Sequence, residues 1–208
     1  MRISVNIDNS STSAPLIAEL TYGHNQPLGK FKKEFHIGKL YSFRGPNGCG
    51  KTTLLETLSG KRDPIHGQAL FNNEDVRHLS QVSHITEISE PVFYPDMSVG
   101  EHFKLLSQHS GVDYDKIIAE WECEDFLNLP PSWLSSGQRQ RLILAAHLAF
   151  PYRVYLADEP ERHLDEYWVN FLIQKFREVT QADSIVICAS HSPKIIAASD
   201  EVIELCDC

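Results

Sequence analysis

Apolar and polar positions alternate in several short segments of the chain, and this pattern predicts β-strands. Residues 3–7, 16–22 and 31–37 show the alternation, and residues 23–29 are expected to form a turn between the last two of these strands. Five shorter apolar runs predict further strands, at residues 40–43, 68–71, 84–88, 153–157 and 184–189. The run at 184–189 is expected to be the last strand of the chain.

Helical periodicity appears in three other segments. Leu54, Leu55 and Leu58 share one face of a predicted helix over residues 51–59, which Gly60 is expected to end. Residues 96–133 look helical throughout, because Ser98 and Glu101 have the spacing of a capping box and apolar residues recur behind them. A third helix is predicted to open at Ser135 or Ser136, either of which is a good N-cap.

Strands that alternate with helices predict an α/β fold whose mostly parallel sheet is flanked by helices. Two parts depart from that alternation. Residues 1–38 together with 61–83 read as an antiparallel β-subdomain, and residues 96–133 read as a small inserted α-helical subdomain. We therefore expect residues 1–208 to form a single domain with these two additions to its core.

Composition narrows the function classes. The 208 residues are 42% hydrophobic and 23% charged, as in water-soluble globular proteins, and the longest apolar run, residues 142–150, is too short to cross a bilayer. The N-terminus does not resemble a signal peptide, so a cytoplasmic location is expected. A formal net charge of −9 argues against broad binding to nucleic acid. The spacing of the five cysteines matches neither a metal site nor a disulfide framework, and a reduced tail is favoured over a metal site for Cys206 and Cys208.

A phosphate-binding loop lies between the strand at residues 40–43 and the helix that follows it. Its pattern is G-x-x-x-x-G-K-[ST], in which glycines let backbone N–H groups approach an anion, the lysine adds charge and the hydroxyl can bind Mg²⁺. The flanking strand and helix are the context that this motif requires, because the helix N-terminus then faces the phosphates. The motif comprises Gly45, Pro46, Asn47, Gly48, Cys49, Gly50, Lys51, Thr52 and Thr53.

Three polar residues follow the ends of predicted parallel strands, where sheets of this kind bind ligands. Asp158 is placed to hold Mg²⁺, and Glu159 is placed to take a proton from a water that attacks the γ-phosphate. A solvated acidic loop is the simpler alternative for this pair. His191 follows the strand at 184–189 and could hydrogen-bond the γ-phosphate, whereas His147 is expected to be a packing residue.

Tyr22 precedes the loop by about the length of one antiparallel unit, so its ring could stack on an adenine. On position alone, a tyrosine packed at a strand edge is an equally good interpretation.

Taken together, these motifs resemble the ATPase subunit of an ATP-binding-cassette transporter over nearly the whole chain. Gly45 to Thr53 corresponds to the family's Walker A loop, residues 154–159 to Walker B with the catalytic glutamate, and residues 134–138 to the signature Leu-Ser-Gly-Gly-Gln. Glu161 to Asp165 corresponds to the D-loop and His191 to the switch histidine. The fold implied is a phosphate-loop NTPase core.

The resemblance also implies function. ATP and Mg²⁺ would be bound and ATP hydrolysed, with Lys51, Glu159 and His191 as catalytic residues and Thr52 and Asp158 at the metal. Two copies would close head to tail, so that Ser135, Gly137 and Gln138 of one meet the γ-phosphate held by the other. Hydrolysis would power transport of an unknown substrate through a separate transmembrane permease. The chain would then be peripheral on the inner face of the membrane, with no nucleic acid expected as a partner.

The sequence departs from the family pattern at several positions. Ser136 replaces the first signature glycine, which is harmless if the position is helical, as we expect. Ser89 stands by register where the family has the Q-loop glutamine, with Glu87 and Glu90 as possible substitutes. Glu161 and Arg162 replace small D-loop residues. We also expect no regulatory domain after the last strand.

Two other function classes are consistent with part of this pattern. A non-transport cassette ATPase would act as a nucleotide-gated clamp on nucleic acid or the ribosome, and the acidic charge and single cassette argue against it. A phosphate-loop kinase would need an acceptor, and the signature and the Asp158–Glu159 pair argue against that class.

Overall fold

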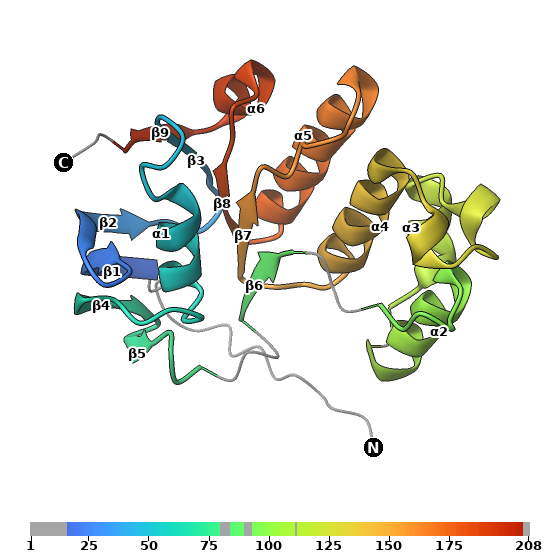
Figure 1. Ribbon diagram of the computed structural model, residues 1–208, viewed down its shortest axis with the longest axis horizontal. Helices are drawn as coiled ribbons and strands as arrows, with labels where there is room; N and C mark the ends of the chain where they lie inside the picture. The colour runs from blue at the N-terminus through green and yellow to red at the C-terminus, as the bar shows by residue number, and fades with distance from the viewer. Residues whose placement is uncertain (1–15, 80–83, 90–92, 111, 206–208) are drawn as a thin grey trace.

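The computed structural model describes residues 16–79, 84–89, 93–110 and 112–205, in which the strands form two sheets (Figure 1). The larger sheet has five parallel strands in the order β6-β7-β8-β3-β9, and the smaller has four antiparallel strands in the order β2-β1-β4-β5. The parallel strands are β3 (Leu40–Arg44), β6 (Ile85–Ile88), β7 (Val154–Asp158), β8 (Ile185–Ala189) and β9 (Glu201–Glu204). The antiparallel strands are β1 (Leu16–Gly23), β2 (Pro27–Phe35), β4 (His66–Phe71) and β5 (Glu74–Asp75).

Both faces of the parallel sheet are covered, which explains why its central strands are mostly apolar and why β8 is apolar at every position. All five residues of β8 are fully buried. Successive side chains in a strand point to opposite faces, so Val186 and Cys188 of β8 join one core cluster, while Ile185, Ile187 and Ala189 join the other.

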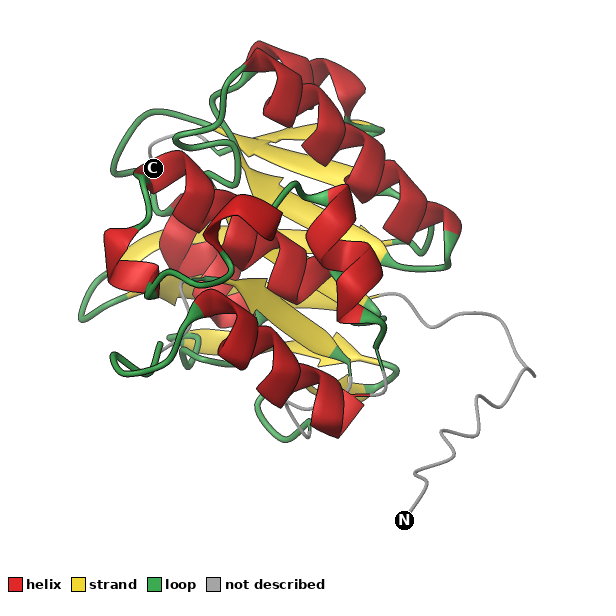
Figure 2. Ribbon diagram, turned by 90° about the vertical axis from the view of Figure 1, so that its right-hand side faces the viewer, coloured by secondary structure: helices red, strands yellow, loops and turns green. Residues whose placement is uncertain are grey.

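The helices divide between these two faces (Figures 1 and 2). Helix α1 (Lys51–Leu58) contacts β1 of the small sheet and β7 and β8 of the large one, so it lies between the sheets. Helices α5 (Glu166–Gln181) and α6 (Pro193–Ala198) contact the other face of the large sheet and each other.

The predicted helical insertion is present and lies beyond β6, away from the antiparallel sheet (Figure 1). It contains α2 (Val99–Ser110), α3 (Tyr114–Glu120) and the short 3-10 turns at Glu124–Phe126 and Pro131–Trp133, followed by α4 (Ser136–Leu148). The capping box at α2 is confirmed, because Glu101 Oε2 accepts from Ser98 N–H at 2.7 Å and Ser98 Oγ accepts from Glu101 N–H at 3.3 Å.

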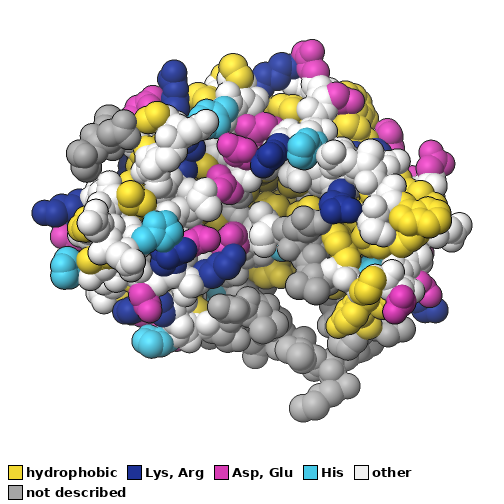
Figure 3. All heavy atoms as spheres, in the orientation of Figure 1, with side chains coloured by type: hydrophobic (Ala, Val, Ile, Leu, Met, Phe, Trp, Pro, Cys, Tyr) yellow, Lys and Arg dark blue, Asp and Glu magenta, His cyan; other side chains and the backbone are white. Residues whose placement is uncertain are grey.

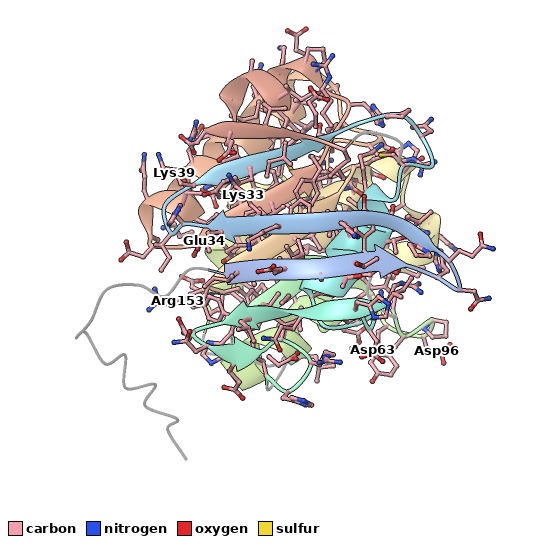
Figure 4. All side chains as sticks on the ribbon, turned by 90° about the vertical axis from the view of Figure 1, so that its left-hand side faces the viewer. Lys33, Glu34, Lys39, Asp63, Asp96 and Arg153 are labelled. Atoms are coloured by element: carbon pink, nitrogen blue, oxygen red, sulfur yellow. The ribbon has the colours of Figure 1, made fainter. Side chains whose placement is uncertain are left out.

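The antiparallel sheet presents charged side chains on its outer face, among them Glu34 near one end of β2, whereas the adjacent Lys33 lies on the opposite face with the buried Phe31 and Phe35 (Figure 4). Lys33 reaches across to β9, its Nζ lying 2.6 Å from Glu201 Oε1. This ion pair ties the small sheet to the edge strand of the large one. The α/β architecture predicted from the sequence, with its antiparallel and helical additions, is confirmed.

Several details of the sequence prediction are wrong. Strand β2 already begins at Pro27, so the turn after β1 is shorter than the predicted 23–29. Residues 184–189 do not form the last strand, because β9 follows α6. The strand predicted at 3–7, Glu90 and the cysteines at 206 and 208 lie outside the described residues. Within the described part of the chain, no helix combines the length and apolar character needed to span a membrane.

Candidate functional site

The phosphate-loop motif forms the connection between β3 and α1. Gly50 caps the helix at φ 92°, a left-handed conformation that glycine adopts without strain. Its α-hydrogen also faces the Tyr22 ring, which a Cβ at this position would approach to 2.7 Å. The first turn of α1 therefore carries unpaired N–H groups at the carboxyl end of β3, where an anion is stabilised.

Lys51 is 7% exposed, and its ammonium group lies inside the loop rather than in solvent. Its Nζ donates to the carbonyl oxygens of Gly45 at 2.9 Å and Pro46 at 3.0 Å. Two carbonyl acceptors replace part of the water that a charged ammonium loses on burial. A phosphate entering the loop would meet a cation that is already held within it.

Tyr22 does not have the position predicted for a residue that stacks on adenine. It is 3% exposed, its ring packs against Gly50, and its hydroxyl donates to the Cys49 carbonyl at 3.4 Å. A ring without an exposed face cannot receive a base in this conformation. Tyr22 instead supports the loop from the antiparallel sheet.

The two residues predicted to hold a metal are in direct contact. Thr52 Oγ1 donates to Asp158 Oδ2 at 2.5 Å, and both residues are exposed. Hydroxyl and carboxylate oxygens are the ligands that Mg²⁺ prefers, and the ion commonly completes its shell with water and substrate phosphates. Among the described residues, no group of three or more His, Cys, Asp and Glu side chains could hold a metal. The chemistry here thus fits an ion shared with bound phosphates.

Glu159 and His191 face one another beside this pair. His191 Nε2 lies 4.0 Å from Glu159 Oε1, with 48% and 42% of the two side chains exposed. The backbone of Glu159 has a positive φ of 46°, and its N–H donates to the Ala189 carbonyl at 2.8 Å. That hydrogen bond joins the ends of β7 and β8, which brings two residues 32 positions apart in sequence to one edge of the sheet.

The predicted signature segment begins α4. Ser135 is the N-cap: its Oγ accepts from the Gln138 N–H at 3.3 Å, and Gln138 Oε1 accepts from the Ser135 N–H at 2.9 Å. Ser136 is the first helical residue, so the expectation that this position is helical and free of strain is confirmed. A Cβ at Gly137 would come within 2.9 Å of the His163 carbonyl oxygen, so a close approach to the D-loop backbone requires glycine there.

An open cleft of about 520 Å³ joins the start of α4 to the ends of β6 and β7. Acidic and basic side chains are interspersed over the molecular face that Figure 3 shows. Within the described part of the chain, the cleft wall does not include the phosphate loop. The polar residues that line it are Ser89, Ser136, Arg139, Gln140, Asp158, Glu159, Arg162 and His163.

Of the three residues considered for the Q-loop position, Ser89 and Glu87 lie within the described part of the chain. Ser89 follows β6, lines the cleft and accepts a hydrogen bond on its carbonyl oxygen from His147 Nε2 at 3.0 Å. Glu87 points toward the C-terminal end of α1, where Lys61 Nζ lies 3.5 Å from its Oε1, so it does not reach the Asp158 side. Burial lowers the pKa of His147, consistent with the packing role predicted for it.

Sequence reasoning missed three residues that the fold brings to this site. His24 is exposed in the β1–β2 turn, with its Nε2 3.4 Å from Thr53 Oγ1. Gln140 Nε2 donates to the Pro160 carbonyl at 2.8 Å, and Glu161 contacts the loop that holds His191. The sequence marked Glu161 only as a departure from the small residues of the family's D-loop, and the loop that it contacts could not be inferred from that.

Comparison with known proteins gives consistent results. The model of a family described as "ABC transporter" matches residues 28–162. An uncharacterized ABC transporter ATP-binding protein of Mycobacterium tuberculosis is 27% identical over 195 residues, which cover 86% of this chain and 59% of that protein. The Fe(3+) ions import ATP-binding protein FbpC of Escherichia coli O157:H7 is 30% identical over 193 residues, covering 88% of this chain and 56% of that protein.

The chain thus spans between 56% and 59% of the length of these two relatives. Among solved structures, a dimeric ATP-binding cassette in a post-hydrolysis state bound to ADP and Pi superposes with a TM-score of 0.76. It is 21% identical, and the match covers 91% of this chain and 93% of that one. The likeness to this structure is one of fold.

Proposed function

Because the chain belongs to the ABC transporter family, we propose that it binds and hydrolyses ATP and thereby powers transport through a separate membrane subunit. One observation carries the proposal: the phosphate loop, the Thr52–Asp158 contact and the Glu159–His191 pair converge at the carboxyl ends of β3, β7 and β8. Parallel sheets bind nucleotides at such an edge.

The β- and γ-phosphates would lie on the N–H groups at the start of α1, with Lys51 contributing a full charge. Thr52 and Asp158 would hold Mg²⁺. When bound, Mg²⁺ would neutralise charge that develops on the phosphates. Glu159 would accept the proton of the attacking water, and His191 would donate a hydrogen bond to the γ-phosphate.

Two copies would close head to tail on ATP binding. The cleft beside Ser136 does not include the chain's own phosphate loop among the described residues, which supports a role for the Ser136 and Gly137 N–H groups toward the γ-phosphate of a second copy. A two-fold axis would create two identical composite sites. The solved structure with a similar fold is itself dimeric. Ser135 and Gln138 would keep the helix N-terminus in place through their mutual hydrogen bonds.

The partner would be a transmembrane permease, and the chain would sit at the inner face of the membrane as a peripheral subunit. The relative from Escherichia coli O157:H7 carries the name of an ion importer. We also propose that residues 1–38 with 61–83 and residues 96–133 act as separate parts around the nucleotide-binding core.

The test is phosphate release from Mg²⁺-ATP by the purified chain. Changing Glu159 to Gln removes the proposed base but leaves Lys51, Thr52 and Asp158, so turnover should fall about 10²- to 10⁴-fold while ATP is still bound. Because ATP then persists, the variant should accumulate as an ATP-dependent dimer on size-exclusion chromatography. Parental turnover in Glu159→Gln would show that another residue activates the water.

The transport assignment has its own measurement. The tagged chain, purified from detergent-solubilised membranes, should carry a membrane-spanning protein with it. When the Glu159→Gln variant binds ATP, that membrane-spanning protein should be released from it. Co-purification with RNA or ribosomal proteins would instead support the alternative function, a nucleotide-gated clamp on nucleic acid or the ribosome.

A further inference from the structure

Glu161 lies in the connection between β7 and α5, and its carboxylate reaches the loop that follows β8. Its Oε1 accepts from the Ser190 hydroxyl at 2.6 Å and from the N–H groups of His191 and Ser192 at 3.1 Å each. Ser190 is fully buried, and Glu161 Oε2 is also buried and accepts no hydrogen bond from the described residues, so Oε1 alone makes the contact. Hydrogen bonds to an ionised acceptor are roughly twice as strong as neutral ones. Three donors on one oxygen therefore fix the backbone of residues 190–192.

The loop that Glu161 holds carries His191. The His191 side chain is half exposed, and its Nε2 lies 4.0 Å from Glu159 Oε1, which is beyond hydrogen-bond distance. The direction of the imidazole is therefore set mainly by its backbone, which the Glu161 contact and a 3.4 Å hydrogen bond from Ser190 N–H to the Phe43 carbonyl hold in place.

The residues on either side of Glu161 contact α4. The Pro160 carbonyl accepts from Gln140 Nε2 at 2.8 Å, and the His163 carbonyl approaches Gly137. Glu161 thus lies between the helix that begins at the signature and the loop of His191. The small residues common at the start of the D-loop in the family lack a carboxylate that could make the same contact.

We propose that Glu161 is a positioning residue, which sets His191 opposite Glu159 by accepting the hydrogen bonds of residues 190–192. This inference rests on the proposed ATP hydrolysis. Because Pro160 and His163 contact α4, a movement of that helix would also shift the loop that carries His191.

The test compares Glu161→Ala with Glu161→Gln, whose amide oxygen can still accept from the loop. Glu166→Ala is the matched control, because Glu166 is the first residue of α5, directly after the connection from β7, and contacts Lys194 of α6 instead of the loop. Glu161→Ala should lower kcat about 10- to 100-fold, since small misplacements at a reacting centre cost rates of this order. KM for ATP should stay within about twofold, because Lys51 and Thr52 are unchanged. Glu161→Gln should recover most of the rate, and Glu166→Ala should retain it.

A second readout does not depend on catalysis. Amide hydrogen exchange at His191 and Ser192 should become faster in Glu161→Ala and remain unchanged in Glu166→Ala. The double variant Glu161→Ala/His191→Ala should hydrolyse ATP no more slowly than His191→Ala alone, because Glu161 would act through that histidine.

The outcomes separate this inference from the proposed function. Parental kcat in Glu161→Ala would overturn the positioning role while leaving ATP hydrolysis established. If the parent chain released no phosphate, the proposed function would fail. Unchanged amide exchange at His191 in Glu161→Ala would separately overturn the role of Glu161 in holding the loop. Should Glu161→Ala fail to fold, Glu161→Gln carries the test: its neutral oxygen is a weaker acceptor, so modestly faster exchange supports the inference and identical exchange contradicts it.

Discussion

The ammonium group of Lys51 donates to the carbonyls of Gly45 and Pro46, two residues of the loop that leads into its own helix. Phosphate oxygens would compete with these carbonyls for the same protons, and a charged acceptor forms the stronger bonds. The loop is thus organised around its cation before any ligand binds, which reduces the reordering that binding requires.

Changing Lys51 to Ala removes this charge. We expect ATP binding to weaken by more than about tenfold, since a hydrogen bond between charged groups contributes about 1.5–3 kcal/mol. Hydrolysis should fall below detection. The fold should survive, because the carbonyls of Gly45 and Pro46 lie in an exposed loop that water can reach. Titration with a fluorescent ATP analogue and circular dichroism check both statements.

The control is Lys61→Ala, which removes the same charge from an exposed side chain at the other end of α1. It should bind ATP as the parent does. Near-normal turnover in Lys51→Ala would contradict the assignment of the loop.

Tyr22 shows which part of the site could be predicted from the sequence at the scale of a residue. Leu16, Ala18, Leu20 and Tyr22 are alternate residues of β1, and all four face the core. The period of the strand therefore already indicated a buried ring. Its contact with Gly50 depends on how the two sheets pack around α1, and no local pattern contains that information.

At the scale of elements, α4 is held by two different kinds of contact. The Ser135–Gln138 capping box is local, and the sequence predicted a serine cap there. The approach of Gly137 to the His163 carbonyl joins α4 to the connection after β7, 26 positions further along the chain. Since no positive φ occurs at Gly137, this close approach explains the glycine.

Gly137→Ala tests that contact. Alanine favours a helix by about 0.5–1 kcal/mol over glycine, so the helix itself should tolerate the change. The new Cβ would stand 2.9 Å from the His163 oxygen and should displace the segment that follows Glu159. We expect ATP turnover to fall about tenfold or more. Thermal unfolding should confirm that the variant is folded, and phosphate release gives its rate.

Ser136→Gly is the matched change at the neighbouring position. Ser136 is helical, so its replacement should alter turnover only slightly. A rise of more than about tenfold would show that Ser136 impairs the natural signature. Full turnover in Gly137→Ala would show that the displaced segment does not reach Glu159.

Strand β9, one of the elements that sequence reasoning missed, is an edge strand. Glu201 and Glu204 are exposed at its ends, and its neighbour on the inner side is β3. An edge strand can pair through its backbone without a buried face, so it shows neither a continuous apolar run nor clear alternation. The central strands were predictable because burial on both faces favours nearly continuous apolar runs.

On the scale of the whole molecule, one of the two core clusters encloses ionisable groups that stay protonated at neutral pH. Burial raises the pKa of the Cys123 and Cys188 thiols to about 12, and for Cys188 the nearby Glu161 charge adds to this effect. Burial also raises the pKa of the Tyr155 hydroxyl to about 12. Cys188 lies in the large sheet and Cys123 in the helical insertion, so these groups report on different parts of the molecule.

These pKa values predict that stability falls in alkaline solution. A group whose pKa is raised on folding stabilises the native state fully below its unfolded pKa, which is about 8.5 for a thiol. Above that pH the unfolded chain loses the proton while the native chain keeps it, so the free energy of unfolding decreases until the folded pKa is reached. At pH 10 the expected loss is about 1–2 kcal/mol for each of the two thiols.

Urea unfolding at intervals between pH 8 and pH 10 would measure how steeply the free energy of unfolding falls with pH. Cys123→Ala should show a shallower fall because it lacks one titrating thiol. A free energy of unfolding that stayed constant over this range would mean that Cys123 and Cys188 are accessible to water in the native protein.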